Sequence, residues 1–199
     1  MLAMGLNMLS SRRSIACRHF AACGAVVLVL CFASPLVGAQ DGAAPAVDQS
    51  WLARVSYVVD GDSIWVRPED GGARVKLRLD GIDAPEICQT AGADARAALQ
   101  TLALDQRVRV TVRARDRWGR AIASVVRLRG NLDVAQAMVA QGWAWTDAYG
   151  WRPGKYARAE AEARAAGRGL FAAPDPQTPA DFRRRHGSCN THQPAAGRR

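Results

Sequence analysis

Alternation of apolar and polar residues is the feature that most limits what this chain can fold into. In the centre of "RVKLRLDGI" (74–82) and of "RVRVTVRAR" (107–115) every second residue is apolar, and most of the residues between are charged. Alternation with period two predicts strands that bury one face and leave the other in solvent. Shorter runs of the same character predict three more strands, near 53–59, 64–66 and 121–130.

Three further segments have a helical pattern, namely residues 93–106, 131–142 and 154–171. Asn131 is the expected N-cap of the second of these helices, and Gly142 is its expected end. The predicted order is therefore three strands, a helix, two strands and two helices. This order predicts an α+β domain, and the three closely spaced strands at its start favour a small barrel.

Residues 1–39 are expected to be a signal peptide rather than part of the folded domain. Three arginines precede an apolar run, and "VGA" (37–39) places small residues at a suitable cleavage site. An uncleaved membrane anchor is the alternative, but the run is short for a full span and Pro35 interrupts it. We therefore expect a secreted or periplasmic protein with no stable membrane association after cleavage, and a linker over residues 40–52.

The charge of the chain favours a polyanionic partner. The formal net charge is +9, and +6 remains without the first forty residues, which hold three arginines and no acidic residue. Arginine dominates over lysine, and its forked guanidinium suits phosphate or carboxylate recognition. A basic balance also fits plain solubility, so it favours nucleic acid as a partner without requiring it.

Two of the five cysteines, Cys88 and Cys189, lie beyond the expected signal peptide. An exported chain can join such a pair in an oxidising compartment, and the alternative is two free thiols. The disulfide would hold the C-terminal tail beside the segment that follows Glu86. His186 and His192, both in that tail, are too few for a zinc site.

Polar residues cluster at three places beside predicted strand ends, where sites are usually built. The clusters are "DGDS" (60–63), "RLDGIDAPE" (78–86) and "RDRWGR" (115–120). If a barrel brings the first and third strands together, several carboxylates meet and repel one another unless a cation neutralises them. Carboxylates, a hard cation such as Ca²⁺ or Mg²⁺ and forked arginines together suit attack on a phosphodiester.

Four motifs, in this order and at fitting intervals, carry a resemblance to a known family: "VVDGDSIWV", "VKLRLDGIDAPE", "DRWGR" and "MVAQGWAW". Over residues 53–171 the chain resembles the staphylococcal nuclease-like (thermonuclease) family. The resemblance implies a five-stranded OB-fold barrel with about three helices, which agrees with the order of the predicted elements. It also implies a Ca²⁺-dependent phosphodiesterase, an endonuclease that cuts DNA and RNA.

The resemblance assigns roles to single residues of the acidic motifs. Asp62 and Asp83 match Ca²⁺-binding carboxylates, and Ala84 stands where the family supplies a backbone carbonyl to the metal. Glu86 matches the general base that activates water. Asp60-Gly61 is expected to make the tight turn that aims Asp62 at the metal, with the glycine letting the backbone bend without crowding the cation.

The resemblance also implies residues that contact nucleic acid. Arg78 and Arg120 match two arginines that hold the phosphate and stabilise the transition state, although a solvated strand position is the commoner fate of an arginine such as Arg78. Trp118 replaces a tyrosine and can stack on a base or sugar. Tyr149 lies where the family places tyrosines that contact phosphate. We expect a monomer that binds DNA or RNA.

Residues 172–199 are expected to form a basic tail, because no strong periodic pattern follows Phe171. The Arg183-Arg184-Arg185 run is interpreted as solvated, with a supplementary phosphate contact as the alternative. A second function class stays open, namely a catalytically silent OB-fold module that binds nucleic acid or a protein partner. Members that only bind tend to lose catalytic carboxylates or arginines, and none of the matched residues is missing here.

Overall fold

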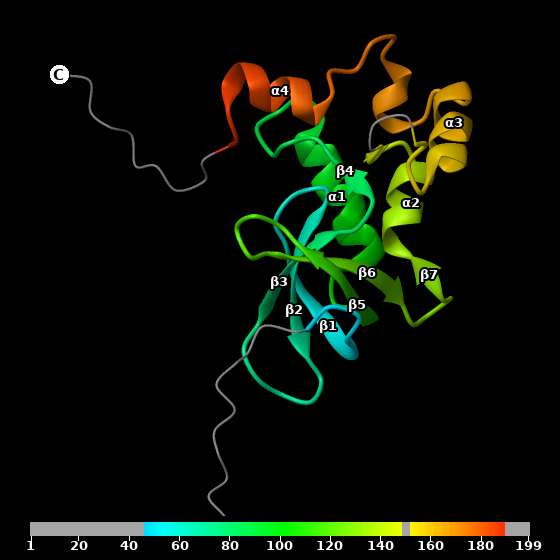
Figure 1. Cartoon of the computed structure of the whole chain (residues 1–199). Coiled ribbons are helices and arrows are strands. Elements are labelled where there is room, and N and C mark those ends of the chain that lie inside the picture. The colour runs from blue at the N-terminus through cyan, green and yellow to red at the C-terminus, as the bar shows by residue number, and fades with distance from the viewer. Residues whose placement is uncertain (1–45, 149–151, 190–199) are drawn as a thin grey trace, which may run out of the picture. The chain divides into compact units, whose positions relative to one another are not determined.

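A closed β-barrel forms the centre of the protein, whose computed structural model describes residues 46–148 and 152–189 (Figure 1). The barrel strands are β1 (Ser50–Val58), β2 (Ser63–Pro68), β3 (Val75–Leu79), β5 (Arg107–Arg115) and β6 (Ala121–Arg127). Neighbours in the order β3-β2-β1-β5-β6 pair antiparallel, and a parallel pairing of β3 with β6 closes the sheet. The predicted five-stranded barrel and the α+β class are confirmed.

The inward faces of these strands form the apolar core. Leu77 and Leu79 of β3 are buried, as are Val108, Val110 and Val112 of β5, while the residues between them are more exposed. Because successive strand side chains point to opposite faces, the charged residues of β3 lie on the other side of the sheet. The alternation of the sequence therefore fixes which side chains of β3 are available for a site.

β1 begins at Ser50, three residues before the expected start near Ala53. The extra residues pair with β5, and Ser50 lies opposite Thr111 in that ladder. Their side chains are mostly exposed, so the backbone pairing leaves little hydrophobic signal in the sequence. The segment interpreted as a linker over 40–52 thus contributes its last residues to the barrel.

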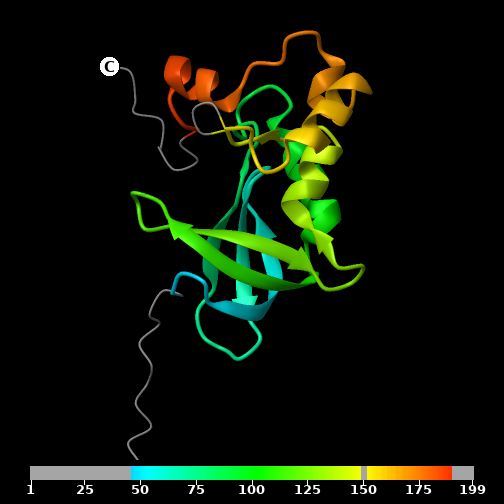
Figure 2. The same cartoon turned by 45° about the vertical axis from the view of Figure 1, so that its right-hand side comes forward.

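Among the described residues four α-helices accompany the barrel: α1 (Gly92–Ala103), α2 (Val134–Ala140), α3 (Ala157–Ala165) and α4 (Pro179–His186), with a 3₁₀ turn over Gly169–Ala172. Figure 2 shows the same helices gathered toward one end of the barrel. Short strands complete the fold, with β7 (Leu132–Asp133) beside β6, and β4 (Ile82–Asp83) paired with β8 (Trp145–Thr146). In the described part of the chain no helix has the length and apolar character needed to cross a membrane.

Two expected details of the helices are wrong. The N-cap of α2 is Asp133, whose carboxylate accepts the N–H of Gln136 at 3.1 Å, whereas Asn131 has a positive φ of 46° in the preceding turn. The predicted helix over 154–171 is interrupted, because Gly167 and Gly169 adopt positive φ and end α3 before the 3₁₀ turn.

The segment predicted as a basic tail after Phe171 contains α4. Thr178 caps this helix by accepting the N–H of Asp181 at 3.2 Å, and Pro179 occupies the first turn. A helix of eight residues that buries Pro179 and little else has no apolar stripe to recognise in the sequence.

Candidate active site

A tight turn between β1 and β2 brings Asp62 to the acidic residues of the next motif. The N–H of Val59 donates to the carbonyl of Ser63 at 2.8 Å, which closes the turn. Asp62 Oδ2 then accepts the N–H of Ala84 at 3.2 Å, so the carboxylate lies against the segment that follows β4. Asp62 is 4% exposed and Asp83 is 8% exposed, and such buried carboxylates require partners.

The roles of Asp60 and Gly61 in this turn differ from each other. Asp60 Oδ1 accepts the N–H of Asp62 at 3.1 Å, so it caps the turn, and burial together with the neighbouring Asp62 raises the pKa of Asp60 to about 7. A Cβ on Gly61 would lie 2.6 Å from the Cβ of Ala84 and 2.9 Å from that of Ala95. The glycine is needed because the turn packs directly on α1 and on the segment after β4.

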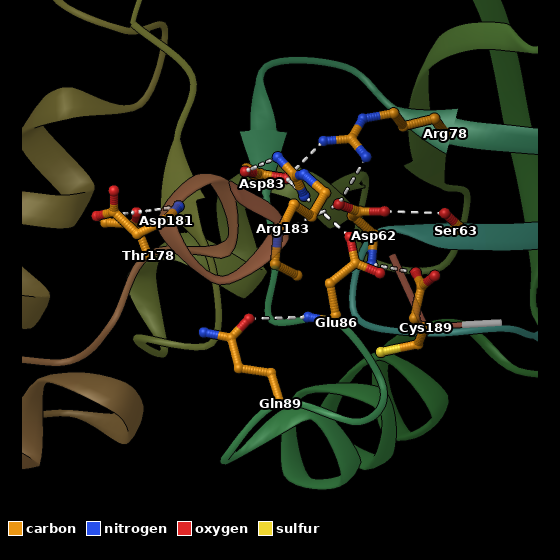
Figure 3. A network of polar contacts seen from close by, with 12 residues as sticks. Asp62, Ser63, Arg78, Asp83, Glu86, Gln89, Thr178, Asp181, Arg183 and Cys189 are labelled. Carbon is orange, nitrogen blue, oxygen red and sulfur yellow. Dashed lines mark hydrogen bonds and ion pairs between the residues drawn. The ribbon is translucent and has the colours of Figure 1, made fainter. Parts of the chain in front are cut away.

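Arg78 of β3 bridges the two buried aspartates (Figure 3). Its Nη1 lies 3.1 Å from Asp62 Oδ2, and its Nη2 lies 2.7 Å from Asp83 Oδ1. Burial alone would lower the pKa of Arg78, but Asp62 and Asp83 outweigh it and the pKa is raised above its ordinary value. Arg78 is therefore a charged partner inside the site rather than a solvated strand residue.

Glu86 forms an ion pair with Arg183, a residue interpreted from the sequence as part of a solvated tail. Arg183 of α4 donates to Glu86 Oε1 at 3.0 Å and reaches Asp83 through two nitrogens, with 2.9 Å between Nη2 and Oδ2 (Figure 3). The pKa of Arg183 is raised, chiefly by its hydrogen bond to Asp83. The interpretation of the arginine run as solvated is wrong for this residue, because the fold of the C-terminal segment aims it at the carboxylates.

The C-terminal segment is attached to the loop after Glu86 at two points. Cys88 and Cys189 form a disulfide with 5.9 Å between their Cα atoms. The Gln89 side chain donates to the Gln177 carbonyl at 2.6 Å and accepts the Glu86 N–H at 3.2 Å. The two cysteines are the signal in the sequence that could have located Arg183, since Cys189 follows it by six positions.

The loop between β5 and β6 supplies the third motif. The carboxylate of Asp116 accepts the N–H groups of Trp118 and Arg120, each at 2.9 Å, and pairs with Arg120 Nε at 2.6 Å. Burial would raise the pKa of Asp116, but the hydrogen bonds to Arg120 and Trp118 lower it overall. Trp118 is 67% exposed, and the Arg117 guanidinium lies 4.1 Å from its ring centroid.

One pocket of about 470 Å³ joins the three motifs and the C-terminal segment. Its lining includes the predicted site residues Asp62, Arg78, Ala84, Glu86, Trp118 and Arg120, together with Arg183. Asp83 is not among the lining residues, and Arg78 and Arg183 both contact its carboxylate oxygens. The predicted phosphate contact Tyr149 lies outside the described residues.

Asp147 is a further acidic residue near the site that the sequence did not indicate. It follows β8, and its N–H donates to the Gly81 carbonyl at 2.9 Å beside the β4 ladder. Burial, reinforced by Asp83, raises the pKa of Asp147. The short pairing of β4 with β8 carries no alternation, so the sequence could not place this carboxylate.

The carboxylate oxygens of the site are ligands that suit a hard cation, but in this structure they form ion pairs with arginines. Asp62, Asp83 and Glu86, named here the carboxylate cluster, offer the oxygen ligands that Ca²⁺ prefers. Within residues 46–148 and 152–189, no group of three or more acidic, histidine or cysteine side chains is arranged to hold a metal ion. In this arrangement an arginine faces each member of the carboxylate cluster.

Comparison with known proteins relates this arrangement to nucleases. A family model described as "Staphylococcal nuclease homologue" matches residues 76–173. An uncharacterized endonuclease of Haemophilus influenzae is 34% identical over 131 residues, which cover 66% of this chain and 72% of that protein. A micrococcal nuclease of Shigella flexneri is 35% identical over 139 residues, covering 65% of this chain and 79% of that protein.

Plant relatives match over a shorter part of their length. A probable staphylococcal-like nuclease of Oryza sativa is 38% identical over 112 residues, or 56% of this chain. Those residues make up 30% of the plant protein, so this chain spans less than a third of it.

Proposed function

Because the chain belongs to the staphylococcal nuclease-like family, we propose that it is a Ca²⁺-dependent nuclease that hydrolyses phosphodiester bonds of DNA or RNA. The observation that carries this proposal is the convergence of Asp62, Arg78 and Glu86 in one pocket with Arg120. Buried carboxylates beside forked cations are costly to maintain and suit chemistry on a phosphate.

Glu86, Arg78 and Arg120 each have a role in this reaction. Glu86 takes a proton from a water molecule while the water oxygen attacks phosphorus and the bond to the leaving oxygen breaks. Arg78 and Arg120 face the negative charge that grows on the phosphate and leaving oxygens, and both stay protonated throughout. Asp62, Asp83 and the carbonyl of Ala84 would hold Ca²⁺, which when bound would supply further positive charge to offset that of the phosphate.

The loop between β5 and β6 favours nucleic acid as the substrate. The ring of Trp118 is exposed at the pocket, where it offers an apolar face on which a base or sugar can stack. Arg117 and Lys76 add positive charge to the same pocket, as binding to a polyanion requires. Stacking and phosphate contacts are tolerant of sequence, which fits a general nuclease.

We also propose that the protein acts outside the cytoplasm as a monomer. The signal-like segment over residues 1–39 supports export. A disulfide between Cys88 and Cys189 persists best in an oxidising compartment. Detection of the protein without residues 1–39 in the periplasm or medium, and its mass by light scattering, test these two points.

The test of the activity is incubation of the purified protein with single-stranded DNA, duplex DNA and RNA, each with Ca²⁺ or a chelator. Cleavage that the chelator abolishes is expected. Absence of cleavage under every condition, together with binding to the same nucleic acids, would support the alternative of a silent OB-fold module. That alternative is favoured by one observation, namely that Arg183 covers Asp83 and Glu86.

A further inference from the structure

Arg183 lies on the carboxylates that the proposed cation needs. It contacts both oxygens of Asp83 and Oε1 of Glu86, over distances of 2.9 to 3.1 Å. Arg78 also contacts Asp83, with 2.7 Å between its Nη2 and Oδ1, the oxygen that Arg183 Nη1 contacts as well. Together the two arginines contact both carboxylate oxygens of Asp83, so a cation gains access to these oxygens when one guanidinium withdraws.

The two arginines are held in unlike ways, which indicates the one that withdraws. Arg78 projects from β3 in the middle of the barrel ladder and also pairs with Asp62. Arg183 projects from α4, in a segment that we call the C-terminal arm (residues 177–189). Of α4 itself only Pro179 is buried, and none of the described arm residues belongs to an apolar cluster of the core. Movement of Arg183 therefore disturbs far less packing than movement of Arg78.

The arm nevertheless keeps Arg183 close to the carboxylates, because both of its ends are attached to their loop. Cys189 bonds to Cys88, two positions after Glu86, and Gln177 accepts a hydrogen bond from Gln89. Tethering of this kind raises the effective concentration of the guanidinium at the carboxylate cluster without any new contact. The ion pairs of Arg183 and the tether of the arm thus both keep the guanidinium at the carboxylate cluster.

We propose that Arg183 is a further active-site residue that competes with the divalent cation for Asp83 and Glu86, and that the Cys88–Cys189 disulfide strengthens this competition. The inference rests on the proposed function, since it concerns the cation of that same site. Like charges repel at close range in a partly buried site, so the guanidinium and the cation exclude each other. Competition by Arg183 therefore raises the concentration of cation that is needed to occupy Asp83 and Glu86.

The direct experiment measures Ca²⁺ affinity by isothermal titration calorimetry for the purified protein and for Arg183→Gln. The variant is expected to bind Ca²⁺ at least about tenfold more tightly, because it frees oxygens held by charge-assisted hydrogen bonds. Arg185→Gln is the matched control, since it removes the same charge from an exposed position on the same helix. Its affinity is expected to stay within about twofold of the parent protein.

Arg183→Lys guards against a variant that fails to fold. Lysine keeps the charge but loses the fork that spans Asp83 and Glu86, so an intermediate Ca²⁺ affinity is expected. Circular dichroism of each variant reports whether the fold is kept. A Ca²⁺ affinity that is unchanged or lower in folded Arg183→Gln, while the parent protein binds Ca²⁺, overturns the competition and leaves the proposed function standing.

Kinetics separate competition from direct contact with substrate. At saturating Ca²⁺ the KM of Arg183→Gln for nucleic acid is expected to change no more than that of Arg185→Gln, which removes the same charge from the same helix. A raised KM with unchanged Ca²⁺ affinity would make Arg183 a phosphate contact and overturn the inference. No Ca²⁺ binding by any of the variants would overturn the metal part of the proposed function and the inference with it.

The role of the disulfide is tested by a double-mutant cycle. Replacement of both Cys88 and Cys189 by serine is expected to tighten Ca²⁺ binding about threefold in the parent background. In the Arg183→Gln background the same replacement is expected to change nothing, because the tether acts through Arg183. Equal effects in the two backgrounds would show that the tether acts independently and overturn its part in the competition.

Discussion

The barrel and the C-terminal arm bring charged residues to the same pocket, but different interactions hold them there. Arg78 lies on β3, whose backbone is paired in the barrel ladder and whose neighbouring residues fill the core. Arg183 lies on a short helix held by a disulfide, a few hydrogen bonds and ion pairs. The barrel therefore supplies a permanent part of the site, and the arm supplies a part that depends on its tether.

The largest effect on turnover is expected at Glu86, which lies in the loop after β4 and pairs with Arg183 of the arm. Glu86→Gln keeps the shape of the side chain but removes the proposed base, so turnover is expected to fall by about 10²–10⁴-fold. Binding to nucleic acid, measured by fluorescence anisotropy, is expected to change little. Glu162→Gln, an exposed residue of α3, is the control. A Glu86→Gln protein as active as this control would remove Glu86 from the chemistry.

The next largest effect is expected on the free energy of unfolding when Arg78 or Arg183 is replaced by alanine. Arg78→Ala leaves Asp62 and Asp83 buried without their shared partner, and loss of about 3 kcal/mol in the free energy of unfolding is expected. Arg183→Ala removes a more exposed partner from a peripheral helix, so a loss of about 1 kcal/mol is expected.

Urea denaturation of both arginine variants, without divalent cations, measures this difference. The comparison of barrel and arm predicts that Arg78→Ala is the less stable of the two by a clear margin. Equal losses would mean that the arm is as firmly built into the structure as the barrel, which would also weaken the proposed competition.

Packing around the turn that positions Asp62 is tested by Gly61→Ala. The added Cβ would lie 2.6 Å from the Cβ of Ala84, so a loss of about 2 kcal/mol in the free energy of unfolding is expected. Ala84→Gly in the same chain removes that contact and is expected to restore part of the loss. A fully stable single variant would show that the turn tolerates more space than its contacts indicate.

The same comparison explains which parts of the protein the sequence could predict. Strand positions in β3 and β5 follow from alternation, and alternation also placed Arg78 on the face away from the core. The motifs around Asp62 and Glu86 predicted the pocket because each lies next to a strand end. Local pattern is sufficient wherever burial of one face decides the structure.

Arg183 and Asp147 escaped prediction because long-range contacts decide where they lie. The disulfide that fixes the arm joins residues 101 positions apart, and the short ladder of β4 with β8 involves two residues on each strand. Neither leaves a periodic signal. Gly61 was interpreted as leaving room for a cation, whereas its neighbours are the methyl groups of Ala84 and Ala95.

The smallest effects on stability and on KM are expected for Trp118 in the loop between β5 and β6. This loop belongs neither to the packed interior of the barrel nor to the arm. Trp118→Ala is expected to leave the free energy of unfolding within about 0.5 kcal/mol of the parent value, because the ring is 67% exposed. The KM for nucleic acid is expected to rise about fivefold, the lower end of what loss of one stacked base causes. Trp118→Phe keeps an aromatic face and is expected to recover most of the affinity. A large loss of stability in Trp118→Ala would instead mean that Trp118, with Arg117 and Arg120 beside its ring, holds the loop in place.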